Sequence, residues 1–426
     1  MKINSTVDKI AKNTVYQIVG KVVSMSITML AVVIITRTYG REGYGYFSLM
    51  QSWPALFFVI VDFGINAIAA KDLTSDWSKA NKYLGNILIM RLIFSAFLVF
   101  TISWILKFFP YSRDLEVGIR LGMFLLITQS LYSTTNIFFQ VKLRYDFSTI
   151  AYTVGYLLIL GLVVLFSLLK INIMWVNFSY VLGGLATFLL SMFFVRKMGV
   201  KPDFSYDPVL WKYLIIASLP IGIMFLFSQM SFKEDALMLS FLKLPESYGL
   251  DNTESVAVYA LPYKVFEVLL VVPTFFMNSV YPVLVERMDK GREDLKNAFS
   301  KVMYFLTFSG LFVGFLGVVF SPLAIKVLGG SEFSQSIDVL RILSAGLFIF
   351  YLTSPFSWLI VTLGYQKYLP WVYLISFTFN MVSNFIFIPK YSFYAASWVT
   401  VVSECIVLIL LAFFAKKSWK LKYGAN

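Results

Sequence analysis

The chain alternates long apolar runs with short polar connections over its whole length. Runs such as 156–169 (YLLILGLVVLFSLL) and 305–320 (FLTFSGLFVGFLGVVF) contain no charged residue. Apolar runs of this kind are typical of membrane-spanning helices, and a bilayer admits only helices or closed barrels because backbone groups must pair internally there. The runs are too long and too uniformly apolar for the alternating strands of a barrel. The pattern therefore predicts an all-α polytopic membrane protein.

The spacing of the apolar runs predicts twelve membrane-spanning helices, joined by connections of at most about a dozen residues. A weak similarity between residues 42–53 and 254–265 indicates a duplication, so we expect two pseudo-symmetric six-helix lobes, 1–200 and 201–426, around a central cavity. The predicted helices lie at 13–36, 43–69, 84–107, 117–140, 148–169, 172–195, 209–242, 254–285, 297–320, 333–361, 367–388 and 392–415.

Composition and charge agree with this interpretation. The chain is 59% hydrophobic and 14% charged, against about 25% charged residues in soluble domains. If both termini are cytosolic, 22 of the 36 Lys and Arg residues lie in or beside cytosolic connections and nine in or beside outer ones. The positive-inside rule therefore favours cytosolic termini. The same bias explains the net charge of +13 without a nucleic acid partner.

Several kinds of chemistry lack the residues they need. The chain has one cysteine, Cys405, and no histidine, so we expect no disulfide framework, metal site or cofactor. The sequence contains no GxxxxGK(S/T) loop, which argues against ATP hydrolysis. No long outer loop is available for the chemistry of a membrane glycan polymerase or ligase. We therefore expect a transport protein and not an enzyme.

Five stretches together resemble the Wzx-type polysaccharide flippases (O-antigen and repeat-unit flippases) of the multidrug/oligosaccharidyl-lipid/polysaccharide (MOP) exporter superfamily. They are YGREGYGYFSLMQSW (39–53) with DFGINAIAAKDL (62–73), VAVYALPYKVFEVLLVVPTFFMNSVYPVL (256–284), GGSEFSQSIDVLRILS (329–344) and NFIFIPKYSFYAASWVTVVSE (384–404). The resemblance covers nearly the whole chain. It implies a MATE-like fold with alternating access in the bacterial cytoplasmic membrane. The implied cargo is an undecaprenyl-pyrophosphate-linked oligosaccharide, moved from the inner to the outer leaflet for surface polysaccharide biosynthesis. Peptidoglycan-precursor flippases typically have two additional helices, for which there is no room.

Helical spacing separates cavity-facing residues from lipid-facing ones. In the first helix, polar residues at spacings of 4, 4, 3 and 4 form one face, which either lines a cavity or packs against other helices. These residues are Asn13, Gln17, Lys21, Ser24 and Thr28.

Charged residues inside helices are candidate functional residues by default. Asp62 is either an ion-coupling residue or the partner of Lys71 at the cytosolic interface. We expect Arg91 to extend to the inner headgroups. Lys264 and Glu267 have the i, i+3 spacing of a local ion pair.

The seventh predicted helix contains three consecutive charges. Lys233 shares a face of small and polar residues with Gln229, whereas Glu234 and Asp235 are turned about 100° and 200° away. We therefore expect Lys233 to face the cavity. Glu234 and Asp235 would pair with adjacent helices or reach the outer water, and the alternative is that all three are interfacial.

These positions lead to three sets of expected roles. An anionic pyrophosphate needs cations, and sugars need amides, so the expected substrate-binding residues are Lys21, Lys233, Lys264, Gln17, Gln229 and Asn380. Coupling to a proton or sodium gradient is expected at Asp62, Glu267 and Glu404. Asp338 and Arg341 are expected to form a structural pair or gate.

Three alternative functions remain. A multidrug exporter of the same superfamily would favour acidic residues over lysines in its cavity. A membrane glycan polymerase or ligase would need the missing outer loop, and a non-transporting scaffold would not need polar faces. Expected partners of a flippase are the lipid-linked glycan, membrane lipids and, as candidates, other glycan-assembly membrane proteins.

Overall fold

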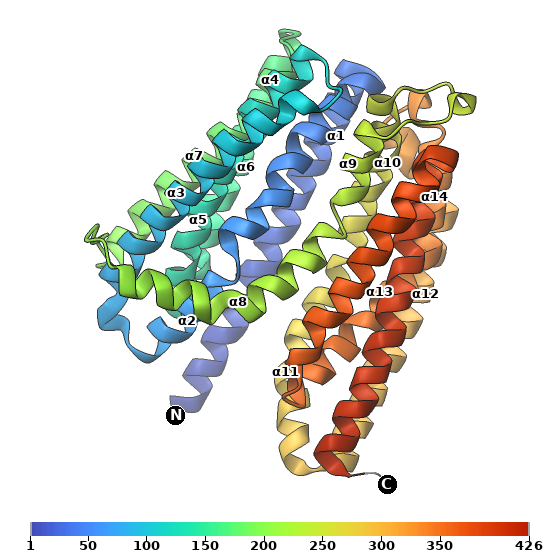
Figure 1. Cartoon of the computed structure of the whole chain (residues 1–426). Coiled ribbons are helices and arrows are strands. Elements are labelled where there is room, and N and C mark those ends of the chain that lie inside the picture. The colour runs from blue at the N-terminus through green and yellow to red at the C-terminus, as the bar shows by residue number, and fades with distance from the viewer. Residues whose placement is uncertain (1, 425–426) are drawn as a thin grey trace. The chain divides into compact units, whose positions relative to one another are not determined.

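The computed structural model describes the backbone of residues 2–424 and the side chains of residue 13 and residues 15–424. Within these residues all regular structure is helical, which confirms the all-α fold (Figure 1). The α-helices are α1 (Lys2–Asp62), α2 (Ile65–Ser75), α3 (Ala80–Ile105), α4 (Arg113–Gly122), α5 (Phe124–Val141), α6 (Tyr145–Leu168), α7 (Ile173–Lys197), α8 (Pro208–Met230), α9 (Glu234–Phe241), α10 (Asn252–Leu269), α11 (Val271–Lys290), α12 (Arg292–Leu328), α13 (Ser336–Thr362) and α14 (Leu369–Tyr423).

Two of these helices each contain most of two predicted membrane spans. α1 has 61 residues and α14 has 55, which at about 1.5 Å per residue is far more than a hydrocarbon core of about 30 Å requires. Each is interrupted by one residue with a positive φ, Gly40 (65°) in α1 and Ser392 (50°) in α14. The described residues form ten helical spans long and apolar enough to cross a membrane, two of which are these double ones. All twelve predicted apolar segments are therefore helical.

Four of the predicted helices are interrupted in the structure, which corrects the expected boundaries. The segments 43–69, 117–140, 209–242 and 254–285 break at 63–64, at Met123, at 231–233 and at Leu270 respectively. At the first break Gly64 has a φ of 75°, which glycine adopts without the steric cost that a Cβ would add. Apolarity predicts that a segment crosses the membrane, but a break needs only one or two residues and leaves the apolar pattern unchanged.

The chain divides into two compact units, Met1–Leu226 and Phe227–Asn426, so α8 belongs mainly to unit 1. The segment that precedes α8 explains this assignment, because two asparagines of the 80–86 region fasten it to α3. The side chain of Asn81 accepts from the backbone N–H of Lys201 (2.9 Å), and Asn86 donates to the carbonyl of Ser205 (2.9 Å). Asn86 also accepts from the indole N–H of Trp211 (3.0 Å). The duplication near residue 200 remains a prediction.

Within unit 1, α8 also packs directly on the break between α1 and α2. A Cβ on Gly222 would lie 2.6 Å from the ring of Phe63 and 2.7 Å from its carbonyl oxygen. Glycine is therefore the residue that lets the two backbones approach at this point. The contact fixes the position of Asp62, the last residue of α1.

Unit 2 combines a short buried helix with long helices that present apolar faces outward. Seven of the eight residues of α9 are buried, from Glu234 to Ser240. By contrast, α12 exposes Phe308, Phe312 and Phe315 at 69%, 63% and 64% of their surface. A row of exposed phenylalanines at helical spacing is typical of a lipid-facing surface.

Candidate functional site

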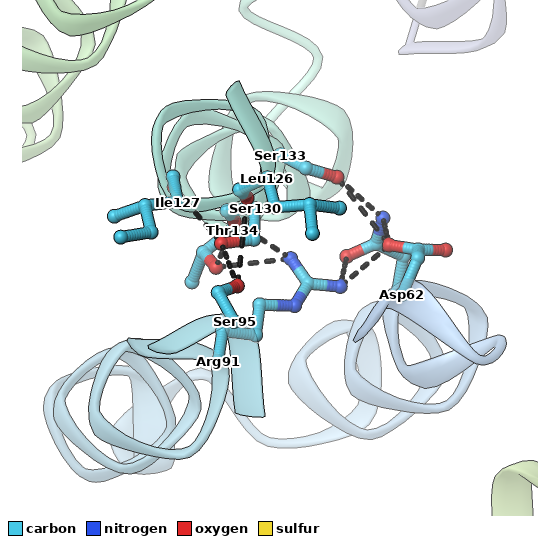
Figure 2. A network of polar contacts seen from close by, with 9 residues as sticks. Asp62, Arg91, Ser95, Leu126, Ile127, Ser130, Ser133 and Thr134 are labelled. Atoms are coloured by element: carbon cyan, nitrogen blue, oxygen red, sulfur yellow. Dashed lines mark hydrogen bonds and ion pairs between the residues drawn. The ribbon is translucent and has the colours of Figure 1, made fainter. Parts of the chain in front are cut away.

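The most deeply buried charge of unit 1 is Arg91, on α3, whose side chain is 0% exposed. Its Nη2 lies 2.5 Å from Oδ1 of Asp62 and donates to Oδ1 of Asn66 at 2.9 Å. Its Nη1 donates to the carbonyl of Ser130 (3.2 Å) and to the hydroxyl of Thr134 (2.9 Å) on α5. Figure 2 shows the guanidinium lying between Asp62 on one side and the α5 residues on the other.

The carboxylate end of this network is also well bonded. Asn66, in the first turn of α2, donates to Oδ1 of Asp62 (2.7 Å) and to the hydroxyl of Ser133 (2.9 Å). Ser133 in turn donates to Asp62 at 3.4 Å (Figure 2). The network is electrically neutral and joins α1, α2, α3 and α5, so its first effect is to hold the helix break at 63–64 in place.

Two expectations about these residues are wrong. Arg91 does not extend to the headgroups, because its carboxylate partner lies beside it inside unit 1. The partner of Asp62 is Arg91 and not Lys71. The proposed ion-coupling role of Asp62 stays a prediction, and the ion pair that already occupies this carboxylate weakens it.

The polar face of the first helix is divided in the structure. Asn13 is buried, and its side chain accepts from the backbone N–H of Tyr145 (3.0 Å) at the start of α6. Gln17 and Lys21 are exposed, and the carbonyl of Lys21 accepts from the hydroxyl of Ser24 (2.9 Å). Asn13 therefore packs between helices, and the substrate-binding roles of Gln17 and Lys21 remain predictions.

In unit 2 two lysines share one carboxylate. Lys233, in the turn between α8 and α9, donates to Oε1 of Glu267 at 2.6 Å, and Lys264 donates to Oε2 at 2.9 Å. The i, i+3 pair predicted on α10 is therefore present. The three side chains are partly exposed, at 25% for Lys233, 38% for Lys264 and 32% for Glu267. This lysine triad, Lys233–Glu267–Lys264, has two positive charges for one negative charge and remains accessible to a ligand.

Asp235 is the fully buried charge of this region, at 0% exposure. Its Oδ2 accepts from the hydroxyls of Tyr259 (2.5 Å) and Thr400 (2.8 Å), and its Oδ1 accepts from the amide of Asn384 (2.5 Å). These donors come from α10 and α14. The expectation that Asp235 contacts adjacent helices is therefore confirmed, and the alternative that it reaches outer water is wrong.

Glu234 is buried beside Asp235, at 7% exposure. The amide group of Asn380, with its nitrogen facing the two carboxyl groups, donates to Oε1 of Glu234 (2.9 Å) and to Oδ1 of Asp235 (3.1 Å). Asn380 therefore contacts the acidic pair, which sequence reasoning did not anticipate. Carboxylate, amide and hydroxyl oxygens are ligands that small hard cations prefer, and two buried carboxyl groups need compensating positive charge or protons.

The helix break at 231–233 corrects the continuous helix that the sequence predicted through these three charges. Lys233 has non-helical backbone angles (φ −121°, ψ −17°), so the residues before and after it do not follow one continuous helical wheel. The face that was expected to carry Lys233 and Gln229 together does not continue into α9. Glu234 and Asp235, the acidic neighbours of Lys233, are buried in unit 2. Gln229 is exposed near the end of α8.

The remaining candidates have bonding partners other than the residues of the lysine triad. Glu404 accepts from the hydroxyl of Thr353 at 2.6 Å, a partner that no sequence pattern indicated. Arg341 and Asp338 form the predicted pair at 3.1 Å, with side chains 48% and 56% exposed. Exposed pairs of this kind contribute about 0–1 kcal/mol, so this one adds little to stability.

Comparisons with known proteins agree with the resemblance found in the sequence. The family model described as "Polysaccharide biosynthesis protein" matches residues 10–288, and the MatE model matches residues 220–386. The capsular polysaccharide biosynthesis protein CapF of Staphylococcus aureus is 22% identical over 419 residues, which cover 95% of this chain and 99% of CapF.

Solved structures of low sequence identity have the same fold. An inward-facing multidrug resistance MATE family transporter of the MOP superfamily has a TM-score of 0.79 at 12% identity, covering 95% of this chain and 96% of that one. The lipid II flippase MurJ, in an inward closed conformation, has a TM-score of 0.74 at 16% identity, covering 95% and 89%. The chain therefore belongs to the polysaccharide biosynthesis protein family and is a multi-pass membrane protein with the fold of the MOP superfamily, as the Wzx-type resemblance indicated.

Proposed function

We propose that the protein flips undecaprenyl-pyrophosphate-linked oligosaccharides from the inner to the outer leaflet of the bacterial cytoplasmic membrane by alternating access. Its family, the capsular polysaccharide relative and the fold that it has in common with a lipid II flippase support this class of cargo. In this proposal both termini are cytosolic, as the distribution of Lys and Arg favours.

The observation that carries the proposal is the lysine triad. Lys233 and Lys264 are partly exposed, and both bond the single carboxylate of Glu267. A pyrophosphate has several anionic oxygens and can replace that carboxylate without leaving either lysine unbonded. Charge-assisted hydrogen bonds of this type contribute about 1.5–3 kcal/mol each, which is enough to hold the headgroup and weak enough to release it.

We further propose that cation or proton coupling belongs to Glu234 and Asp235. This moves the coupling role away from Asp62 and Glu267, because both carboxylates already bond cationic side chains. Glu234 and Asp235 are buried among neutral hydroxyl and amide groups, so a proton or a sodium ion can supply their missing positive charge. Asp235 lies two residues from Lys233 along the chain, which gives a short path between coupling and substrate binding.

The experiment that tests this function is a flipping assay in proteoliposomes with a fluorescently labelled undecaprenyl-pyrophosphate oligosaccharide. We expect Lys233→Ala and Lys264→Ala each to lower the flipping rate roughly 10- to 100-fold, the equivalent of one charge-assisted hydrogen bond. Lys243→Ala is the matched control, because Lys243 is an exposed lysine in the connection after α9. Its flipping rate should equal that of the parent protein.

The same proteoliposomes distinguish the proposed flippase from the main alternative, a MATE-like exporter. A MATE-like exporter would use an imposed ion gradient to drive the efflux of a cationic dye, and it would leave the lipid-linked oligosaccharide in its leaflet. Dye efflux without flipping, in protein of normal thermal stability, would contradict the proposed function and favour the exporter. Equal flipping by Lys233→Ala and Lys243→Ala would instead reject the role of the lysine triad.

A further inference from the structure

One end of unit 2 concentrates basic residues. The turn between α11 and α12 at Gly291 and the C-terminal end of α14 lie together at this end (Figure 1). The basic residues of these two segments are Arg287, Lys290, Arg292, Lys296, Lys416, Lys417, Lys420 and Lys422. None of them belongs to the lysine triad or to the acidic pair, so the proposed transport site does not explain them.

A groove of about 290 Å³ opens among these residues, between α12, α13 and α14. Three cationic side chains line it: Arg292 and Lys296 from α12, and Lys416 from α14. Trp419 also lines it, and the rest of its lining consists of apolar residues that include Phe299 and Phe356. No acidic residue lines the groove in the part of the chain that the structure describes.

Local sequence explains the shape of the groove. The rings of Phe299 and Phe356 meet edge to face, with centroids 5.6 Å apart, and form an apolar floor. Ala412 and Ala415 of α14 also line it, and small side chains there leave room beside the floor. Arg292 is the first residue of α12, where the partial positive charge of the helix dipole adds to that of the side chains.

The acidic neighbour Glu293 competes only weakly for Lys296. Glu293 lies 3.8 Å from Lys296, with side chains 71% and 63% exposed. Asp294 lies 3.6 Å from Arg287, again on an exposed surface. Exposed pairs of this type contribute at most about 1 kcal/mol, so an incoming phosphate can replace Glu293 at little cost.

We propose that this groove binds an anionic membrane phospholipid, with the phosphate between Arg292, Lys296 and Lys416 and the first acyl carbons on the Phe299–Phe356 floor. Three cations around one hollow complement an anionic phosphate, and a basic pocket between membrane helices is typical of lipid headgroup sites. The apolar floor adds contact area that a free phosphate does not use. Trp419 completes the site, since tryptophan is favoured at the level of the headgroups.

The test uses Trp419 as a reporter in the purified full-length protein. Phosphatidylglycerol and phosphatidylcholine with brominated acyl chains are titrated into the protein in neutral detergent micelles, and tryptophan quenching is recorded. The chain has nine tryptophans, so the signal from Trp419→Phe is subtracted. We expect the phosphatidylglycerol to quench Trp419 at lower concentration than the phosphatidylcholine, and Lys296→Gln and Lys416→Gln to weaken this preference roughly fivefold each.

Lys301→Gln is the matched control, because Lys301 is exposed on the same helix and does not line the groove. An unchanged preference in this control supports the groove. Three results would overturn the proposal: equal quenching by both lipids, an equal loss in Lys301→Gln, or displacement of the brominated lipid by free pyrophosphate. Because the measurement is binding and not flipping, its failure would leave the proposed transport function untouched.

Discussion

The two units bury charge in opposite ways. In unit 1 the fully buried Arg91 lies against its own carboxylate, Asp62, and each end of the pair has further hydrogen bonds. In unit 2 the acidic pair of Glu234 and Asp235 is buried among tyrosine, threonine and asparagine donors. The first arrangement is electrically neutral without a ligand, whereas the second gains from an added positive charge.

This difference assigns separate tasks to the two networks. A closed ion pair that connects four helix segments holds the break at 63–64 in one geometry. In unit 2 the acidic pair is suited to binding a cation, and the partly exposed lysine triad close to it in sequence is suited to binding a polyanion. We therefore expect mutations in unit 1 to act mainly on folding and mutations in unit 2 mainly on transport.

The largest effect should come from Asp62→Ala. It leaves the guanidinium of Arg91 buried without its ion-pair partner, which typically costs about 3–5 kcal/mol. We expect a strongly lowered Tm in detergent and a poor yield of folded protein, whereas Lys71→Ala should have little effect. If Asp62→Ala has the Tm of the parent protein and loses only the stimulation of flipping by an ion gradient, Asp62 is a coupling residue. The proposed division between folding in unit 1 and transport in unit 2 would then be wrong.

The second effect should come from Asp235→Asn. Three donors converge on this carboxylate, and an amide group has only one acceptor oxygen, so at least one hydrogen bond is lost at a cost of about 1–3 kcal/mol. We expect the protein to fold and to flip its substrate without stimulation by an ion gradient. Glu404→Gln is the control, and a loss of gradient stimulation there but not in Asp235→Asn would return the coupling role to Glu404.

A third and smaller effect should come from Glu267→Gln. Neutralising the shared carboxylate removes the anion that competes with the pyrophosphate for both lysines, so binding should tighten roughly tenfold while release slows. Binding of a labelled lipid-linked pyrophosphate and single-turnover flipping would separate these steps. Weaker binding in this variant would mean that Glu267 is needed to position the lysines.

The smallest effect should come from Arg341→Ala. Its pair with Asp338 is about half exposed, and such pairs contribute at most about 1 kcal/mol. We expect an unchanged Tm and an unchanged flipping rate. A large loss of flipping at normal stability would give this pair the role of a gate.

The sequence was sufficient for the fold because burial in a membrane leaves a local and repeated signal. The apolar runs identified the helices that are long and apolar enough to cross a membrane among the described residues, and the i, i+3 spacing identified the pairs Lys264–Glu267 and Asp338–Arg341. The same periodicity correctly predicted that Asp235 contacts adjacent helices, but it missed the helix break beside the three charges 233–235. The prediction assumed one continuous helix through residues 231–233, where the chain turns. A shift of one residue along a helix rotates a side chain by about 100°.

The sequence by itself therefore determined that the chain spans the membrane as helices, which residues are charged within those helices, and which charges pair within one turn. Tertiary structure alone decided that Arg91 pairs with Asp62 across 29 residues and Lys233 with Glu267 across 34. It also decided that Asp235, and not Lys233, is fully buried. The physical reason is that apolar burial depends on average composition, whereas a polar contact depends on helix breaks, rotation and packing at single residues.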